Sequence, residues 1–114
     1  MLARDNRLTA RGDFIETVRK GRRAHVGALT GFVYSASTSN ETIPPRFGFQ
    51  VSRRVGGSVQ RHRVVRQLRH LIAPWVEQTP HSTMVVIRPD QKVEDYSEDL
   101  DALMKRLMRS EGVR

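Results

Sequence analysis

The sequence predicts one α+β domain over residues 1–114, an αβββαβα sandwich with a small central sheet and a basic central helix. Three observations lead to this prediction. A chain of 114 residues has room for one domain and too little for two. Its hydrophobic residues, 38% of the total, suffice for a folded core, which excludes disorder of the whole chain. Segments with helical and with alternating apolar periodicity follow one another without an internal repeat.

The first half of the chain is predicted to form one helix and three strands. A short helix over residues 9–20 has Thr9 as its N-cap, Phe14 and Val18 on one face, and Gly21 directly after its end. Alternating residues of high β-propensity then predict three strands and, before the third of them, a polar loop. The strands cover residues 22–26, 29–34 and 46–52, and the loop covers residues 35–45.

The second half is predicted to form a helix, a strand and a further helix. Ser58 follows a Gly-Gly break and is placed to cap a helix that runs to about Ala73, directly before Pro74. The continuous apolar run at residues 84–87 is typical of a strand that is buried on both faces. A last helix begins near residues 95–97, and its apolar face consists of Leu100, Leu103, Met104, Leu107 and Met108.

The charge of the chain is strongly positive and unevenly distributed. Twenty Lys and Arg residues outnumber twelve Asp and Glu residues, which gives a formal net charge of +8. Residues 46–69 contain seven arginines and no acid, whereas residues 90–101 contain six of the twelve acids. This separation predicts one electropositive surface. A nucleic acid is the partner that such a charge favours most, ahead of an acidic membrane surface or an acidic protein.

Several classes of protein are excluded. The absence of cysteine rules out a disulfide scaffold, a thiolate zinc site and a cysteine nucleophile. No segment approaches the roughly 18 apolar residues of a membrane span, and the first residues lack the apolar core of a signal peptide. We therefore expect a cytoplasmic protein that acts on neither a membrane nor a small-molecule substrate.

No catalytic residue and no metal ligand is predicted in the protein itself. The four histidines are scattered, and no metal-binding, paired-carboxylate or phosphate-cradling motif is present. A protein-only nuclease with histidine as acid and base is the alternative, but no constellation of residues supports it. The acids at residues 95–101 fall at the start of the last helix, where carboxylates stabilise the helix dipole. Capping is therefore favoured over metal binding.

The predicted central helix separates apolar from basic residues when it is projected at about 100° per residue. Its apolar side collects Val64, Val65, Leu68, Leu71, Ile72 and Trp75. Its opposite side collects His62, Arg63, Arg66, Arg69 and His70. Arg61 lies toward the apolar side, in the first turn. The arginines have no acid at i+4 to pair with, so they repel one another, and arginine binds phosphate through two oxygens at once. A bound polyanion would relieve this repulsion; the alternative is an ordinary solvated helix face.

Residues 46–69 resemble the signature of the bacterial ribonuclease P protein subunit. In that family a glycine-bearing strand leads through a basic turn into a helix that begins with an Arg-Asn-Arg motif. The flanks are similar too, with Asp13-Phe14 in the first helix and an amphipathic helix at the C-terminus, so the resemblance covers nearly the whole chain. The matching positions of the signature are Gly48, Ser52, Arg53, Arg54, Gly56, Val59, Arg61, Arg63, Arg66 and Arg69.

Two positions depart from the family pattern. His62 stands where the family usually has Asn, which changes the geometry of any hydrogen bond made there, and Val65 stands where it usually has Lys. Val65 projects onto the apolar flank of the helix, and the helix keeps four arginines. We therefore expect RNA binding to survive both departures.

The resemblance implies an accessory subunit whose RNA partner performs the chemistry. Proteins of this family bind a large catalytic RNA that removes the 5′ leader from precursor tRNA. Magnesium ions on that RNA take part in the reaction, and no metal is expected on the protein. The residues expected to bind the catalytic RNA are Arg53, Arg54, Arg61, His62, Arg63, Arg66 and Arg69.

The resemblance also implies a second site, where the leader lies in a cleft between the first helix and the sheet. Its expected residues are Arg11, Phe14, Val18, Arg19, Phe32 and Tyr34. Aromatic rings in such a site stack on bases while arginines hold phosphates. Val18 stands where many members have a second aromatic residue, so weaker stacking is expected.

Alternatives to these assignments stay open at this point. Judged without the resemblance, Phe14 fits the core as well as the cleft, and of Phe47 and Phe49 one is expected in the core and one partly exposed. A general RNA-binding protein, such as a ribosomal or RNA-folding factor, would have the same charge pattern. The arginine face does not separate RNA from DNA, although no second helix precedes it at helix-turn-helix spacing.

Overall fold

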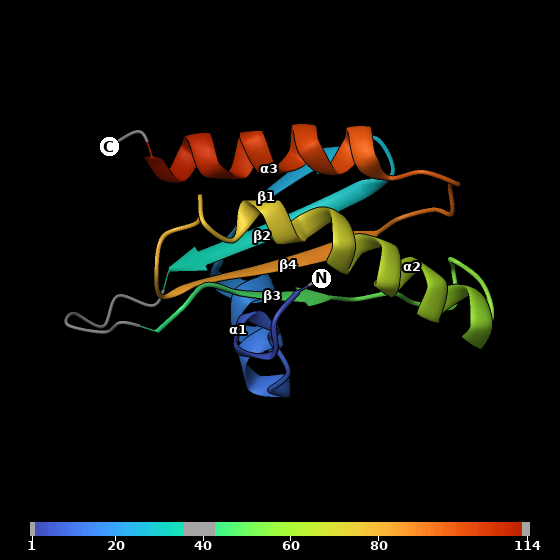
Figure 1. Ribbon diagram of the computed structural model, residues 1–114, viewed down its shortest axis with the longest axis horizontal. Coiled ribbons are helices and arrows are strands. Elements are labelled where there is room, and N and C mark those ends of the chain that lie inside the picture. Colours follow the sequence, from blue (N-terminus) through green and yellow to red (C-terminus); the bar gives the residue numbers. More distant parts are fainter. Residues whose placement is uncertain (1, 36–42, 113–114) are drawn as a thin grey trace.

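Helices cover both faces of a four-stranded sheet (Figure 1). The computed structural model describes residues 2–35 and 43–112. Short 3-10 turns occur at Arg4–Asn6 and Ala73–Trp75. The predicted αβββαβα order is confirmed: the helices and strands are α1 (Arg11–Lys20), β1 (Arg22–Val26), β2 (Leu29–Ser35), β3 (Arg46–Phe49), α2 (Ser58–Ile72), β4 (Thr83–Pro89) and α3 (Ser97–Gly112).

The strands lie side by side in the order β1-β2-β4-β3. β2 pairs antiparallel with β1 and with β4, whereas β3 and β4 pair in parallel. Parallel neighbours require a crossover connection, and α2 supplies it between β3 and β4. β1 and β3 are consequently the two edges of the sheet.

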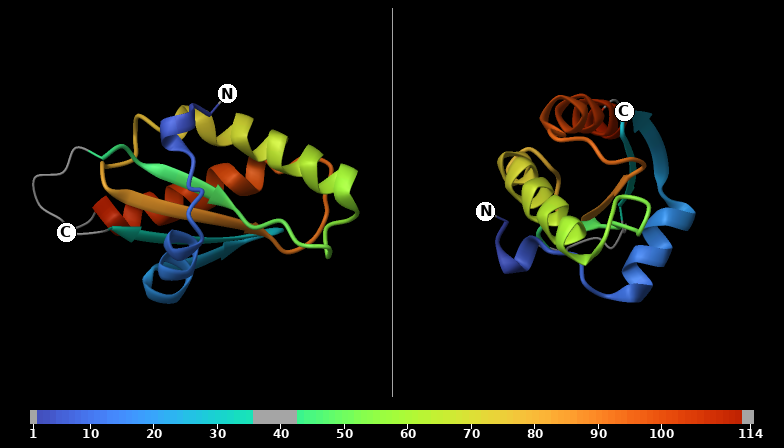
Figure 2. Two further views of the ribbon diagram at one scale, coloured as in Figure 1. Left: turned by 90° about the horizontal axis from the view of Figure 1, so that it is seen from below. Right: turned by 90° about the vertical axis from the view of Figure 1, so that its right-hand side faces the viewer.

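The two faces of the sheet bury different clusters of side chains. The larger core, which the sheet shares with α2 and α3, includes Leu29, Val33, Leu68, Val85 and Leu103. The opposite face carries α1 over a smaller cluster of Leu8, Phe32, Met84 and Val86, with Phe14, Val18 and Tyr34 packed against it. Figure 2 shows α1 on the other side of the sheet from α2 and α3. β4 is buried on both faces, as predicted.

The β1–β2 hairpin is attached to the start of α3. Its two-residue turn consists of Gly27 and Ala28, and Gly27 has a φ of 56°, in the left-handed region that favours glycine. Oδ2 of Asp99, in the first turn of α3, accepts a hydrogen bond from the Ala28 N–H at 3.0 Å. This bond fixes the hairpin tip against the helix.

The cap predicted for the first helix is wrong. α1 begins at Arg11, and Ala10 occupies the N-cap position without a side-chain hydrogen bond. The reason is that the preceding chain is held in an extended form, since the Leu8 N–H donates to the Phe47 carbonyl at 2.9 Å. Thr9 follows directly on this extended segment and does not reach the helix. The predicted end of the helix is confirmed at Gly21.

The cap predicted for the second helix is also wrong. Ser58 is the first residue of α2, and Gly57 occupies the N-cap position. The side chain of Gln60 replaces the expected serine cap, since its Oε1 accepts a hydrogen bond from the Gly57 N–H at 3.1 Å. The interaction satisfies a backbone donor at the entry to the helix.

The third strand is shorter than predicted. β3 ends at Phe49 because the chain turns at residues 52–56, where the Val55 N–H donates to the Ser52 carbonyl at 3.0 Å. Phe47 is buried and Phe49 is half-buried, as expected. Of the predicted loop at residues 35–45, residues 36–42 lie outside the described part of the chain. None of the helices in the described part is long and apolar enough to cross a membrane.

Candidate RNA interface

The basic residues of α2 are exposed because its apolar residues are fixed against the core. Val64, Leu68 and Ile72 are buried, four residues apart. The helical repeat then directs the side chains between them to the flanks and to solvent. His62, Arg63, Arg66 and His70 are exposed, while Arg61, Val65 and Arg69 are half-buried. The predicted separation into an apolar and a basic side is confirmed except at Val65, which was expected on the apolar side but lines a hollow together with His62, Arg66, Arg69 and His70.

Arg53 and Arg54 precede α2 in the turn at residues 52–56. Both are exposed, and Val55 between them and the helix is buried, which anchors the turn. The Arg54 N–H donates to the Ser52 hydroxyl at 3.3 Å. We refer to this turn and the helix together as the α2 basic surface, which consists of Arg53, Arg54, Arg61, His62, Arg63, Arg66 and Arg69.

The α2 basic surface lacks neutralising partners. Within the described ranges no ion pair involves any of its arginines. The Nε of Arg61 is buried there without a hydrogen-bond partner, and an unsatisfied buried donor costs about 1–3 kcal/mol. The positive potential of this surface is therefore available to a phosphate-rich ligand.

Three residues of the α2 basic surface, together with two neighbouring residues of α2, surround a hollow of about 630 Å³. Its lining residues are His62, Val65, Arg66, Arg69 and His70. Val65, the position that departs from the family pattern, thus contributes an apolar patch between cationic and histidine side chains. His70 belongs to this group although it was not among the predicted binding residues; its projection onto the basic side was the available signal.

Arg63 lies on the other flank of α2. It lines a separate hollow together with Val64, Lys92 and Glu94 among other residues. Glu94 and Arg63 do not form an ion pair. The α2 basic surface is therefore wide, with its arginines directed to both sides of the exposed helix face.

The residues predicted for leader binding gather where α1 crosses the sheet. Phe14 and Val18 of α1 and Tyr34 of β2 are half-buried around the smaller apolar cluster. Arg11 and Arg19 are exposed at the two ends of α1. We refer to Arg11, Phe14, Val18, Arg19, Phe32 and Tyr34 as the α1 surface.

Phe32 differs from the other aromatic residues of the α1 surface because it is almost fully covered. Its exposed fraction is 4%, and the guanidinium carbon of Arg88 lies 5.4 Å from the centre of its ring, a cation–π contact. Phe32 therefore supports the surface from below, while Phe14 and Tyr34 present the more accessible rings. Sequence reasoning assigned no role to Arg88, and no sequence signal marks its contact with Phe32.

Two contacts position α1 on the sheet. A guanidinium nitrogen of Arg46 lies 3.1 Å from Oδ2 of Asp13, which joins β3 to the first turn of α1. The ring of Phe14 occupies the space above Gly48, where a Cβ would lie 2.6 Å from its Cε1. Gly48 thus permits the close approach of the helix. Neither contact could be predicted from the sequence, because each joins residues that lie more than 30 positions apart.

The acids near the start of α3 form hydrogen bonds and a local ion pair. Oδ1 of Asp95 accepts the Ser97 N–H at 2.9 Å. Hydrogen bonds from the Ser97 backbone and then from its hydroxyl hold the pKa of Asp95 below its ordinary value. Oδ2 of Asp101 lies 3.1 Å from Nζ of Lys105, one turn later in α3. In the described residues, no three His, Asp or Glu side chains are grouped so that they could hold a metal ion.

The chain is similar in sequence to one family of proteins. A family model described as Ribonuclease P matches residues 2–110. The ribonuclease P protein component of Streptomyces griseus is 42% identical over 118 residues, which cover 95% of this chain and 96% of that protein. The ribonuclease P protein component of Thermobifida fusca is 37% identical over 121 residues, which cover 98% and 82%.

Solved structures share the fold at lower identity. The RNase P protein of Thermotoga maritima superposes with a TM-score of 0.65 at 20% identity, covering 90% of this chain and 96% of that one. A mutant RNase P protein of Staphylococcus aureus, described as defective in mRNA degradation activity, superposes with a TM-score of 0.72 at 15% identity, covering 89% and 86%. The arrangement of helices around the sheet is therefore shared with these proteins.

Proposed function

Because the chain belongs to the ribonuclease P protein family and is the protein component of that RNA-containing endoribonuclease, we propose that the α2 basic surface binds the catalytic RNA subunit. The observation that supports this is the gathering of Arg53, Arg54 and the four arginines of α2 without an ion pair in the described residues. Proteins bind structured RNA largely through its shape and phosphates. Arginines without a neutralising acid suit that mode of binding.

We propose that the α1 surface binds the 5′ leader of precursor tRNA. Exposed arginines at both ends of α1 flank the half-buried rings of Phe14 and Tyr34. The single-stranded leader would lie with its bases against these rings and its phosphates near Arg11 and Arg19. Each stacked base contributes about 1–3 kcal/mol in sites of this kind. The match of the family model over residues 2–110 favours this function over that of a general RNA-binding factor.

In this proposal the protein contributes binding and the RNA subunit cleaves. Magnesium ions held by the RNA would supply the metal that the reaction needs, and no residue of the chain would contact the scissile phosphate. The protein would act in the cytoplasm, where precursor tRNA is processed. Its positive charge would bring the two RNAs together by offsetting their mutual repulsion.

The experiment that tests the function compares the purified protein, the RNA subunit of the same organism and the reconstituted complex on one precursor tRNA. We expect no leader removal by the protein alone. The complex should bind the precursor more tightly than the RNA subunit does and reach half-maximal cleavage at a lower magnesium concentration. Leader removal by the protein without RNA would refute the division of roles, and unchanged binding and magnesium demand would refute the accessory function.

A further inference from the structure

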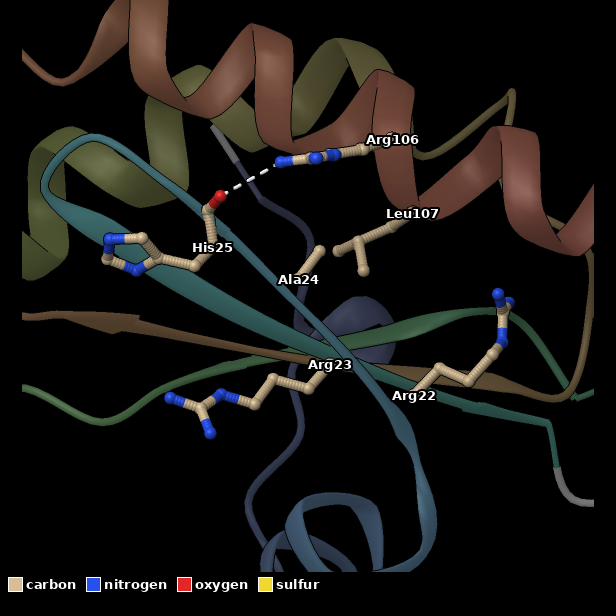
Figure 3. Close-up of a pocket in the computed structure, with 6 residues that line it drawn as sticks. All are labelled: Arg22, Arg23, Ala24, His25, Arg106 and Leu107. Atoms are coloured by element: carbon tan, nitrogen blue, oxygen red, sulfur yellow. Dashed lines mark hydrogen bonds between the residues drawn. The ribbon is translucent and has the colours of Figure 1, made fainter.

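A third basic surface lies at the outer edge of β1 and belongs to neither of the two proposed RNA sites. Figure 3 shows side chains from β1 and from α3 around a cavity of about 480 Å³. Two apolar residues, Ala24 and Leu107, line the cavity between the basic groups. We call this group the β1-edge surface; its polar residues are Arg22, Arg23, His25 and Arg106.

The backbone of β1 contributes hydrogen-bond donors to this surface. The two-residue turn makes Val26 and Leu29 a hydrogen-bonded pair, and such pairs alternate along an antiparallel ladder. Arg23 and His25 therefore direct their N–H and C=O groups away from β2. The Arg106 guanidinium donates to the His25 carbonyl at 3.0 Å, as Figure 3 shows. The outward carbonyl of His25 is thus occupied, whereas the backbone N–H groups of Arg23 and His25 remain directed at the solvent.

The positive charge of the β1-edge surface is concentrated on its arginines. Within the described residues, Arg23 and Arg106 form no ion pair with an acid. His25 differs, because its Nδ1 lies 3.3 Å from Oδ2 of Asp90 and 2.9 Å from the Thr30 hydroxyl. The surface therefore combines outward N–H groups with two guanidinium groups that no acid neutralises, although one nitrogen of Arg106 is engaged by the His25 carbonyl. Such an arrangement suits an anion with several oxygens.

The β1-edge surface lies next to the α1 surface and away from the strand that leads into α2. Arg23 pairs with Phe32 across the strands, so its side chain stands on the face of the sheet that carries α1. β1 starts two residues after α1 ends, close to the exposed Arg19. β3, which leads into α2, lies at the opposite edge of the sheet. A single-stranded RNA that passes over α1 and continues away from α2 therefore reaches the β1 edge.

We propose that the β1-edge surface binds phosphate groups of the leader strand beyond the nucleotides that lie on the α1 surface. This inference rests on the proposed function, in which α2 faces the catalytic RNA and the leader leaves on the other side. Charged residues also protect edge strands from pairing with other chains. Edge protection requires only exposed charge, whereas a phosphate site predicts a dependence of affinity on leader length.

The test uses complexes reconstituted from the RNA subunit and three proteins: wild type, Arg23→Ala and Arg106→Ala. Arg109→Ala is the matched control, since it removes the same charge from an exposed position of α3 outside the cavity. Binding is measured with two precursor tRNAs, one whose leader just covers the α1 surface and one whose leader extends further. Assembly with the RNA subunit and the oligomeric state of each protein are measured separately.

We expect Arg23→Ala and Arg106→Ala to weaken binding of the long-leader precursor about tenfold and to reduce the salt dependence of that binding, because a charged phosphate contact is lost. Short-leader binding, assembly and the Arg109→Ala control should be unchanged. Equal loss with both leaders, weakened assembly, or self-association without any change in affinity would each overturn the proposal. Failure of the wild-type protein to assemble or to tighten precursor binding would instead refute the proposed function.

Discussion

Gly48 is the residue on which the position of α1 depends most directly. A Cβ at this position would lie 2.6 Å from Cε1 of Phe14 and 3.1 Å from the Leu8 Cβ. Leu8 is buried in the cluster beneath α1 and Phe14 packs against that cluster, so an added methyl group would displace both side chains. The absence of a side chain at position 48 of β3 is therefore what allows the Phe14 ring to approach the sheet so closely.

We expect Gly48→Ala to lower the free energy of unfolding by about 1–3 kcal/mol, since extra volume in a packed site forces its neighbours to shift. Affinity for a leader-bearing precursor should fall as well, because Phe14 moves. Urea unfolding and precursor titration measure the two effects. Gly12→Ala in α1 is the control, since nothing lies within 4 Å of its Cβ position. If Gly48→Ala were as stable as the wild-type protein, this result would contradict the close packing of Phe14 on Gly48.

Asp99 has a comparable role at the hairpin tip. Its carboxylate accepts the Ala28 N–H at 3.0 Å and is partly buried beside Gly27. Asp99→Ala should lower the free energy of unfolding by about 1.5–3 kcal/mol, as expected for a hydrogen bond to a charged group. Asp101→Ala, which removes an exposed ion pair with Lys105, should change it by about 0.5 kcal/mol or less. Equal effects in urea unfolding would contradict the assigned role of Asp99.

At the scale of single elements, α2 is a helix whose exposed side is not optimised for its own stability. Arg63, Arg66 and Arg69 follow one another at i+3. Like charges at this spacing destabilise a helix by about 0.2–0.5 kcal/mol per pair. The helix is held by Val64, Leu68 and Ile72 in the core, so its basic side is free to serve binding.

This arrangement predicts opposite effects of one substitution on stability and on binding. Arg66→Gln should leave the free energy of unfolding unchanged or raise it by a few tenths of a kcal/mol at low salt, because like-charge repulsion is reduced. The same change should weaken binding to the catalytic RNA and reduce its salt dependence. Thermal unfolding and RNA titration at several salt concentrations provide the two readouts. A loss of stability with unchanged RNA affinity would show that Arg66 is structural.

The helices and strands could be predicted from the sequence where their hydrophobic residues repeat with a regular spacing. The apolar repeat of α2 and the alternation of β2 identified both elements, and the projection of α2 correctly exposed its basic side. The cap of α1 was not predictable, because Thr9 is displaced by the pairing of Leu8 with Phe47, a contact between distant parts of the chain. The same reason applies to the Phe14–Gly48 contact and to Arg106 at the β1 edge, which tertiary packing brings together.

At the scale of the whole molecule, the sheet separates two basic surfaces. α2 and α3 cover one face and α1 covers the other (Figure 2). The molecule measures 41 × 26 × 26 Å, so two RNA strands bound on opposite faces would lie close together. Of the acids at residues 90–101, Glu98, Asp99 and Asp101 lie in the first turns of α3, whereas Glu94 borders the hollow that Arg63 lines. A small protein of this kind is suited to hold a substrate strand near a second, larger RNA.

The central claim, that the two surfaces bind different RNAs, is tested most directly by two equilibrium titrations of Arg63→Ala and Phe14→Leu. The first measures assembly with the catalytic RNA, and the second measures precursor binding by the assembled complex. Phe14→Leu keeps an apolar side chain but removes the aromatic ring. We expect Arg63→Ala to weaken assembly only and Phe14→Leu to weaken precursor binding only. Normal assembly of Arg63→Ala together with failed assembly of Phe14→Leu would contradict the account, because the two surfaces would then have exchanged roles.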